Sequence, residues 1–219
     1  LHQLVSGQLD VDRMDYLNRD SFFTGVSEGV IGYDRILKML AVKDGNLMVE
    51  EKAIYSIEKF LVSRRLMYWQ VYLHKTVVAC EVMLVETLRR AKQLAMDGEA
   101  VFASPALLRF LRSPQSRENF RDPEVLADFL KLDDHDIMGA VKVWCDHRDK
   151  VLSRSAMDLV HRRNLRIALQ NIPWNDTRVD ELRVQVAQHL GITREEARHF
   201  VITDRIVNNA YDPAKDRIE

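Results

Sequence analysis

The stretch "SGQLDVDRMDYLNRDS", residues Ser6–Ser21, decides the fold of the first part of the chain. Its apolar residues Val11, Met14 and Leu17 lie three residues apart, a spacing that predicts a helix from Asp10 to Ser21 with one apolar face. Four aspartates and two arginines cover the rest of this helix. The polar side chains that can share one face, with Arg13 and Asp15 beside them, are Asp12, Tyr16, Arg19 and Asp20.

Two interpretations of this charged face remain open from the pattern itself. A solvated amphipathic helix with internal ion pairs is a common arrangement on protein surfaces. The functional interpretation is a carboxylate that binds a divalent metal, next to a cation that binds phosphate. Spacing within one helix does not distinguish the two interpretations.

The composition is that of a globular protein. The chain has 219 residues, 47% of them hydrophobic, so it can bury a sizeable core. Its 32 basic and 33 acidic residues give a net charge of -1, which does not favour nucleic acid or an anionic membrane as a partner. Cys80 and Cys145 lie in apolar helical contexts, which predicts free thiols and a cytoplasmic location. No apolar run reaches the length of a membrane span.

A long helical segment follows a predicted hairpin. Asp44-Gly45 separates two short apolar runs, as in the tight turn of a two-stranded ribbon. Residues 51–97 contain neither glycine nor proline, and their apolar residues recur at three- and four-residue steps. This predicts a helical spine that is kinked near Tyr72 and ends at Gly98. Shorter helices are predicted to begin at Ser104-Pro105 and Asp122-Pro123 and to follow Asp133.

The pattern changes near residue 160. Residues 165–170 alternate between apolar and polar, and "FVITDRIV" from Phe200 is rich in branched residues, so both predict strands. Residues 179–190 return to helical spacing, and the final "DPAKDRIE" ends where a further strand could begin. The predicted fold is mainly α, with a small β-hairpin and a C-terminal α+β lobe. The predicted domains are residues 1–160 and residues 161–219.

Four sequence blocks resemble one known family. They are "LDVDRMDYLNRDS" followed by "TGV", "SRRLMYWQVYLHK" at Ser63–Lys75, "LDDHDI" and "RRNL". Together they resemble the HD-domain phosphohydrolases related to deoxynucleoside triphosphate triphosphohydrolases, which include dGTPase-like enzymes and the SAM-and-HD-domain enzyme. The resemblance implies an HD-type helical core in residues 1–160.

The same resemblance assigns roles to residues of both long motifs. Asp12 would be a metal ligand, and Asp12, Arg13 and Arg64 would be the catalytic residues. The substrate-binding residues would be Arg13 and Arg64 on the phosphates, Tyr16 and Asp20 on the sugar, and Tyr72 on the sugar or base. Mn, Mg, Fe, Ni and Zn are not distinguished by these residues.

The family's metal site also needs a His and a His-Asp pair before the position of Asp12. Only eleven residues precede Asp12, and His2 lacks the surrounding pattern. The sequence therefore predicts a C-terminal portion of the enzyme that is inactive alone. His135-Asp136 also spells "HD", but its place after Asp12 and beside Asp133 and Asp134 predicts a helix cap instead.

The predicted function is metal-dependent hydrolysis of dNTPs to deoxynucleoside and triphosphate. The family also implies a homo-oligomer and a nucleotide effector. Two alternatives are a non-catalytic helical interaction or regulatory module, and an HD phosphohydrolase that acts on another phosphate ester. Convergence of Arg13, Tyr16, Asp20, Arg64 and Tyr72 on one concave pocket would favour the enzyme over the interaction module, and their scatter over the surface would count against it.

Overall fold

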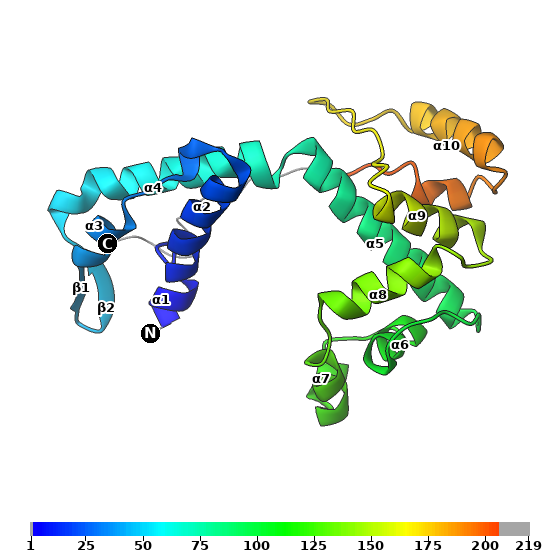
Figure 1. Cartoon of the computed structure of the whole chain (residues 1–219), viewed down its shortest axis with the longest axis horizontal. Coiled ribbons are helices and arrows are strands. Elements are labelled where there is room, and N and C mark those ends of the chain that lie inside the picture. Colours follow the sequence, from blue (N-terminus) through cyan, green and yellow to red (C-terminus); the bar gives the residue numbers. More distant parts are fainter. Residues whose placement is uncertain (1, 206–219) are drawn as a thin grey trace. The chain divides into compact units, whose positions relative to one another are not determined.

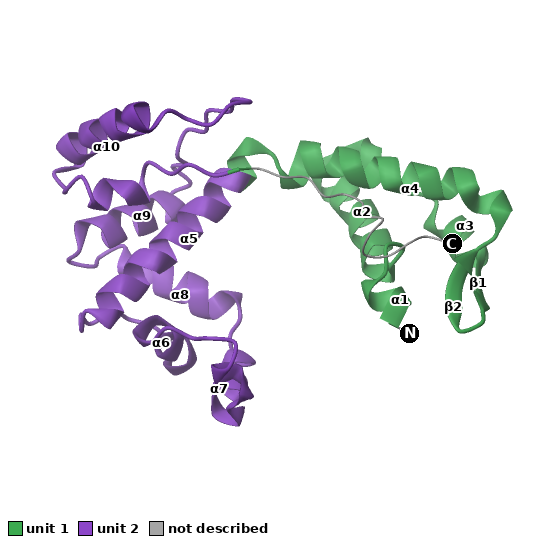
Figure 2. Ribbon diagram, turned by 180° about the vertical axis from the view of Figure 1, so that it is seen from behind, with its two compact units in different colours: residues 1–77, 205–219 green, residues 78–204 purple. Residues whose placement is uncertain are grey.

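A computed structural model describes residues 2–205, which form a mainly α fold with a small β-hairpin. The chain divides into two compact units, one built from residues up to Val77 and the other from Val78 to Asp204 (Figure 2). The sequence placed its domain division at residues 160 and 161. No helix in the described residues is both long and apolar enough to cross a membrane.

The first unit begins with α1 (His2–Ser6) and α2 (Val11–Thr24). Asp10 caps α2, because its carboxylate accepts the backbone N–H of Arg13 at 2.7 Å. The helix ends at Gly25, which has the left-handed φ of 74° that favours glycine. The helix predicted from Asp10 to Ser21 is therefore confirmed and extends one turn further.

The core of the first unit lies where α2 packs against α4 (Ile54–Met67) (Figure 1). Leu17 and Phe60 are fully buried there. Gly29, in a short 3-10 turn after α2, fits only because it has no side chain, since a Cβ would lie 2.9 Å from the backbone oxygen of Leu17. The other buried members of this core are Leu9, Met14, Ile31, Ile36, Ile57 and Met67.

The predicted hairpin is confirmed. It follows α3 (Tyr33–Lys38) and consists of the antiparallel strands β1 (Leu40–Lys43) and β2 (Asn46–Val49). Asp44 and Gly45 both have positive φ, 51° and 77°, as a two-residue hairpin turn of this kind requires. The hairpin contacts α1, where Gln3 accepts the backbone N–H of Leu47 at 2.8 Å.

The predicted helical spine is confirmed but consists of three parts. A 3-10 turn at Glu51–Ala53 leads into α4, which passes into a π-helical turn at Tyr68–Tyr72. A new helix, α5 (Lys75–Met96), then begins, and Gly98 follows it with a φ of 86°. The kink predicted near Tyr72 is this π-helical turn and the break after it. Such turns occur often at functional sites.

In the second unit several helices pack on α5. Trp144 is fully buried, and its indole N–H donates to the Phe102 carbonyl at 2.8 Å. The predicted helix starts at Ser104-Pro105 and Asp122-Pro123 are confirmed, as each first residue caps a helix. The helices after α5 are α6 (Pro105–Arg112), α7 (Pro123–Phe129), α8 (Asp134–Trp144), α9 (Lys150–Val160) and α10 (Asp176–Leu190).

The strand predicted at residues 165–170 is wrong. These residues form no regular element, and the structure gives the Leu165 N–H an atypical acceptor, the Met83 sulfur at 3.3 Å. A strand needs a partner strand, and the described part of the second unit has none. The strand predicted from Phe200 is also absent up to Arg205, and its remainder, like "DPAKDRIE", lies outside the described residues.

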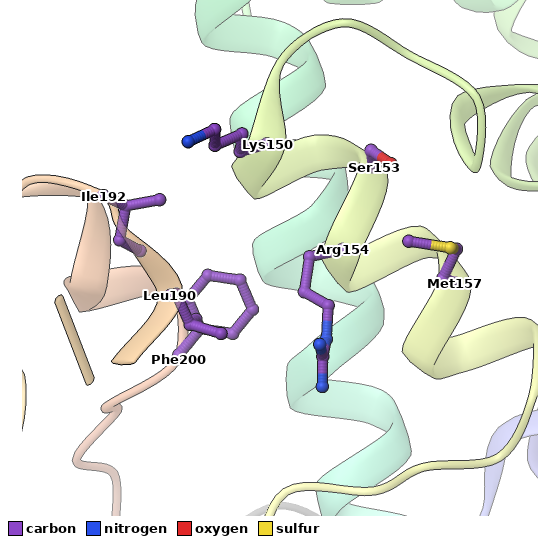
Figure 3. A pocket seen from close by; sticks show the side chains of 7 residues that line it. All are labelled: Lys150, Ser153, Arg154, Met157, Leu190, Ile192 and Phe200. Atoms are coloured by element: carbon purple, nitrogen blue, oxygen red, sulfur yellow. The ribbon is translucent and has the colours of Figure 1, made fainter. Parts of the chain in front are cut away.

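The second unit contains an open pocket of about 220 Å³. It lies between α9 and the segment around Leu190, Ile192 and Phe200 (Figure 3). The α9 residues that line it are Lys150, Ser153, Arg154 and Met157. None of the site residues predicted from the sequence lines this pocket.

Candidate functional site

The predicted sugar-binding residues lie together in the first unit. The Tyr72 hydroxyl donates to the Asp20 carboxylate at 2.7 Å, which joins the π-helical turn to α2. The rings of Tyr16 and Tyr72 meet edge to face, with their centroids 5.8 Å apart. Asp12, Tyr16 and Asp20 are four residues apart along α2, so they follow one another on the same side of that helix.

Tyr68 connects this pair of tyrosines to Arg64. Its ring contacts the Tyr72 ring at a centroid distance of 5.2 Å, and the Arg64 guanidinium carbon lies 5.7 Å from its centroid. Tyr68 also lies close enough to Tyr16 to contribute to the raised pKa of the Tyr16 hydroxyl. The sequence did not single out Tyr68, although it lies four residues after Arg64 and four before Tyr72. That spacing was the available signal.

Arg64 is a buried cation without a carboxylate partner among the described residues. It is 5% exposed, although it is one of the residue types that proteins bury least often. Its Nη1 donates to the Gln8 side chain at a long 3.4 Å, and its Nε is buried with no hydrogen-bond partner in residues 2–205. A buried guanidinium in this state is suited to bind an anion, since an anion would supply the acceptors that it lacks.

Arg13 is bound at the start of α2. Its Nη1 pairs with the Asp10 carboxylate and donates to the Gly7 carbonyl. A guanidinium carries five N–H donors, so Nε and Nη2 can still contact a phosphate. Asp10, which the sequence did not single out, therefore both caps α2 and orients Arg13.

The pKa values of Tyr16 and Tyr72 are both raised by their surroundings. Burial, followed by the nearby Tyr68, raises the pKa of Tyr16 to about 12, although the positive charges of Arg64 and Arg13 act in the opposite direction. The pKa of Tyr72 is raised further by burial and by its hydrogen bond to Asp20. Both phenols are therefore neutral hydrogen-bonding groups at physiological pH, and both arginine charges reach the Tyr16 hydroxyl.

Asp12 is exposed in the first turn of α2. Within residues 2–205 no three or more His, Cys, Asp or Glu side chains are grouped so that they could hold a metal ion. The described residues therefore do not fit a complete metal site, and Asp12 is the single ligand that the sequence assigned. Arg19, expected on the same face, instead pairs with Asp15 at 2.7 Å on the surface.

The His135-Asp136 dipeptide belongs to a helix cap, as predicted. Asp133 accepts the backbone N–H groups of His135 and Asp136, and Asp136 in turn accepts the Asp133 N–H. The His135 side chain is 96% exposed. Cys80 and Cys145 are both free, also as predicted.

A second group of buried charges lies in the second unit and was not predicted. Arg90 on α5 donates to both oxygens of Asp149, at 3.0 and 2.6 Å, and to Glu196 at 3.0 Å. One turn away, Glu86 pairs with His199 at 2.9 Å. These charges satisfy one another, so the group ties the segment after α10 to α5.

Comparison with known proteins connects both units to phosphohydrolases. Residues 31–110 match the model of the HD associated region. A crystal structure of a phosphohydrolase from Bacteroides thetaiotaomicron is 55% identical, with a TM-score of 0.92 over 99% of this chain and 54% of that chain.

Two curated relatives extend the comparison. The uncharacterized protein YwfO of Bacillus subtilis is 34% identical over 95% of this chain and 46% of its own length. A Dictyostelium discoideum protein named deoxynucleoside triphosphate triphosphohydrolase SAMHD1 homolog is 24% identical over 88% of this chain and 41% of its own length. The chain thus spans about half the length of these relatives. It contains an HD associated region and is related to HD phosphohydrolases.

Proposed function

We propose that the protein is a phosphohydrolase that splits dNTPs into deoxynucleoside and triphosphate. The observation that carries this proposal is the buried, carboxylate-free Arg64 next to the hydrogen-bonded pair of Asp20 and Tyr72. A cation for phosphate and an acceptor for a sugar hydroxyl thus lie on one connected group of side chains. This arrangement favours an enzyme over an interaction module, in which such residues would have no reason to converge.

Each side chain has a definite task in this proposal. Arg64 donates N–H groups to the phosphates, and Arg13 contributes Nε and Nη2. One Asp20 oxygen is held by Tyr72, and a carboxylate has a second oxygen, which can accept the 3′-hydroxyl of the sugar. Tyr16 and Tyr72 provide aromatic surface against the sugar or base.

The relation to HD phosphohydrolases implies a divalent metal, which would polarise a phosphate and activate water. Asp12 is the residue of this chain that we assign to it. The described residues do not form a complete metal site, so the attack on phosphorus needs ligands besides Asp12.

The test is chromatographic analysis of products after the protein at its full natural length is incubated with each dNTP and Mn²⁺ or Mg²⁺. We expect deoxynucleoside and inorganic triphosphate in equal amounts, released in one step. Arg64→Gln should lower kcat/KM about 100-fold, because it removes charged hydrogen bonds to the phosphates. The exposed Asp34 on α3 provides the control, Asp34→Asn, which should change little.

Stepwise release of monophosphate or pyrophosphate would contradict this reaction. Full activity of Arg64→Gln would contradict the role of the buried cation. Hydrolysis of another phosphate ester without hydrolysis of dNTPs would support phosphohydrolase activity but would contradict dNTPs as the substrate.

A further inference from the structure

Arg64 is held by an aromatic ring where buried arginines more often have a carboxylate. Its guanidinium carbon is 5.7 Å from the centroid of the Tyr68 ring, and its side-chain hydrogen bond within residues 2–205 is the long one to Gln8. A ring face attracts a cation through its quadrupole and bears no net charge. Tyr68 therefore offsets part of the cost of burying Arg64 without neutralising it.

This difference matters for binding an anion. A carboxylate partner would occupy the N–H donors of Arg64 and would repel a phosphate. A ring face has no carboxylate oxygens to accept the N–H groups of the guanidinium, so these donors stay available to an anion. The buried Nε without a partner among the described residues is one of these donors.

Tyr68 itself has an aromatic neighbour that the same turn provides. The Tyr72 ring meets it edge to face, with the ring centroids 5.2 Å apart. Tyr68 is the first residue of the π-helical turn, so its backbone follows directly from the helix that carries Arg64. Tyr68 thus lies between the Tyr72 ring and the Arg64 guanidinium, and the π-helical turn sets its position.

We propose that Tyr68 is a positioning residue that orients Arg64, with its N–H donors free, for a phosphate group of the substrate. This inference rests on the proposed function, because it takes Arg64 as the phosphate-binding cation. It adds a residue that acts through Arg64 without contacting the phosphate.

The experiment is a double-mutant cycle on the protein at its full natural length, with inorganic triphosphate as the probe and calorimetry as the readout. Tyr68→Leu removes the ring and should weaken triphosphate binding about tenfold, the size of one cation–π contact. Tyr68→Phe keeps the ring face and should remain within about twofold. In an Arg64→Gln background, Tyr68→Leu should have less than about a twofold effect, since the residue through which it acts is gone.

A matched control and a second readout separate positioning from general damage. Tyr55→Leu replaces an 80% exposed tyrosine on the same helix and should leave binding unchanged. In NMR spectra of arginine Nε–H groups without any ligand, the Arg64 signal should be shifted by the Tyr68 ring in the wild type and in Tyr68→Phe, and should lose that shift in Tyr68→Leu.

The possible failures are distinguishable. Triphosphate binding that survives Arg64→Gln would reject the proposed function. Binding that needs Arg64 but falls equally with Tyr68→Leu in both backgrounds would reject the positioning role alone. Equal losses in Tyr68→Phe and Tyr68→Leu, or an Arg64 signal that does not respond to Tyr68→Leu, would also overturn it.

Discussion

Arg64 and Arg90 are both buried arginines on long helices, and they differ in what surrounds them. Arg90 makes hydrogen bonds to two carboxylates, whereas Arg64 has a ring face and a long bond to an amide. Two carboxylates satisfy a guanidinium within the protein and leave it a structural role. A cation that the described residues leave partly unsatisfied is stabilised further when an anion binds it.

The largest expected effect is on the satisfied arginine. Arg90→Met leaves Asp149 and Glu196 without their cation and should lower the unfolding free energy of the second unit by about 3–5 kcal/mol. Urea unfolding, followed by hydrogen exchange of amides in residues 78–204, measures this. Arg89→Met is the control, because Arg89 is 67% exposed and its ion pair contributes about 1 kcal/mol or less. Equal effects of Arg90→Met and Arg89→Met would mean that the ion pairs of Arg90 contribute no more to stability than a surface pair, and Arg90 would then not be the structural counterpart of Arg64.

The second effect concerns high pH. Tyr16 has a pKa of about 12 when folded and about 10 when unfolded, so the folded state holds the phenol proton more tightly. This stabilisation is fully present below pH 10 and is lost as the pH rises from 10 to 12.

Tyr16→Phe should therefore remove about 1–2 kcal/mol of the pH dependence in that range, after allowing for partial exposure. Urea unfolding at a series of alkaline pH values checks this, with Tyr55→Phe as an exposed control. An unchanged slope in Tyr16→Phe would mean that Tyr16 ionises like a solvated tyrosine.

The third effect sharpens the comparison within the second unit. Glu196 accepts from Arg90 and also from the Thr193 N–H at 2.8 Å, and the Thr193 hydroxyl accepts the Glu196 N–H at 3.2 Å, so the two residues form a capping box. Glu196→Gln keeps the shape and removes the charge, so it should cost about 1 kcal/mol. Thermal unfolding gives the value, and a loss as large as that of Arg90→Met would show that Glu196, not Asp149, is the main partner.

The smallest expected effect is on the unsatisfied arginine. Arg64→Met replaces a buried charge that lacks a carboxylate by an apolar chain of similar length. The unfolding free energy of the first unit should therefore stay the same or rise by about 1 kcal/mol. Denaturant unfolding of the ligand-free protein tests this. A loss of more than about 2 kcal/mol would mean that Arg64 is structural, as Arg90 is.

Local patterns predicted the elements well. Asp44-Gly45 specifies its turn through backbone conformation, and Asp133 and Ser104 specify helix starts through their own neighbours. These signals act within a few residues. The alternation at residues 165–170 was misleading for the same reason, because a strand also depends on a distant partner that the pattern does not reveal.

The site was predicted only where the family resemblance reached. It assigned Asp20, Arg64 and Tyr72, and the structure brings these three residues into one group. Their assigned roles stay predictions. Pairings such as Arg90 with Asp149, 59 residues away, have no local pattern, and periodicity can identify a buried face without identifying what packs on it.

The π-helical turn has a consequence for how this segment can vary. The number of residues in this turn fixes the direction in which Tyr72 points relative to Arg64 and Tyr68. A deletion of one residue would rotate Tyr72 by about 100° away from Asp20. Substitutions along Tyr68–Tyr72 leave the direction of Tyr72 unchanged, whereas insertions and deletions alter it. The length of this segment is thus more constrained than its composition.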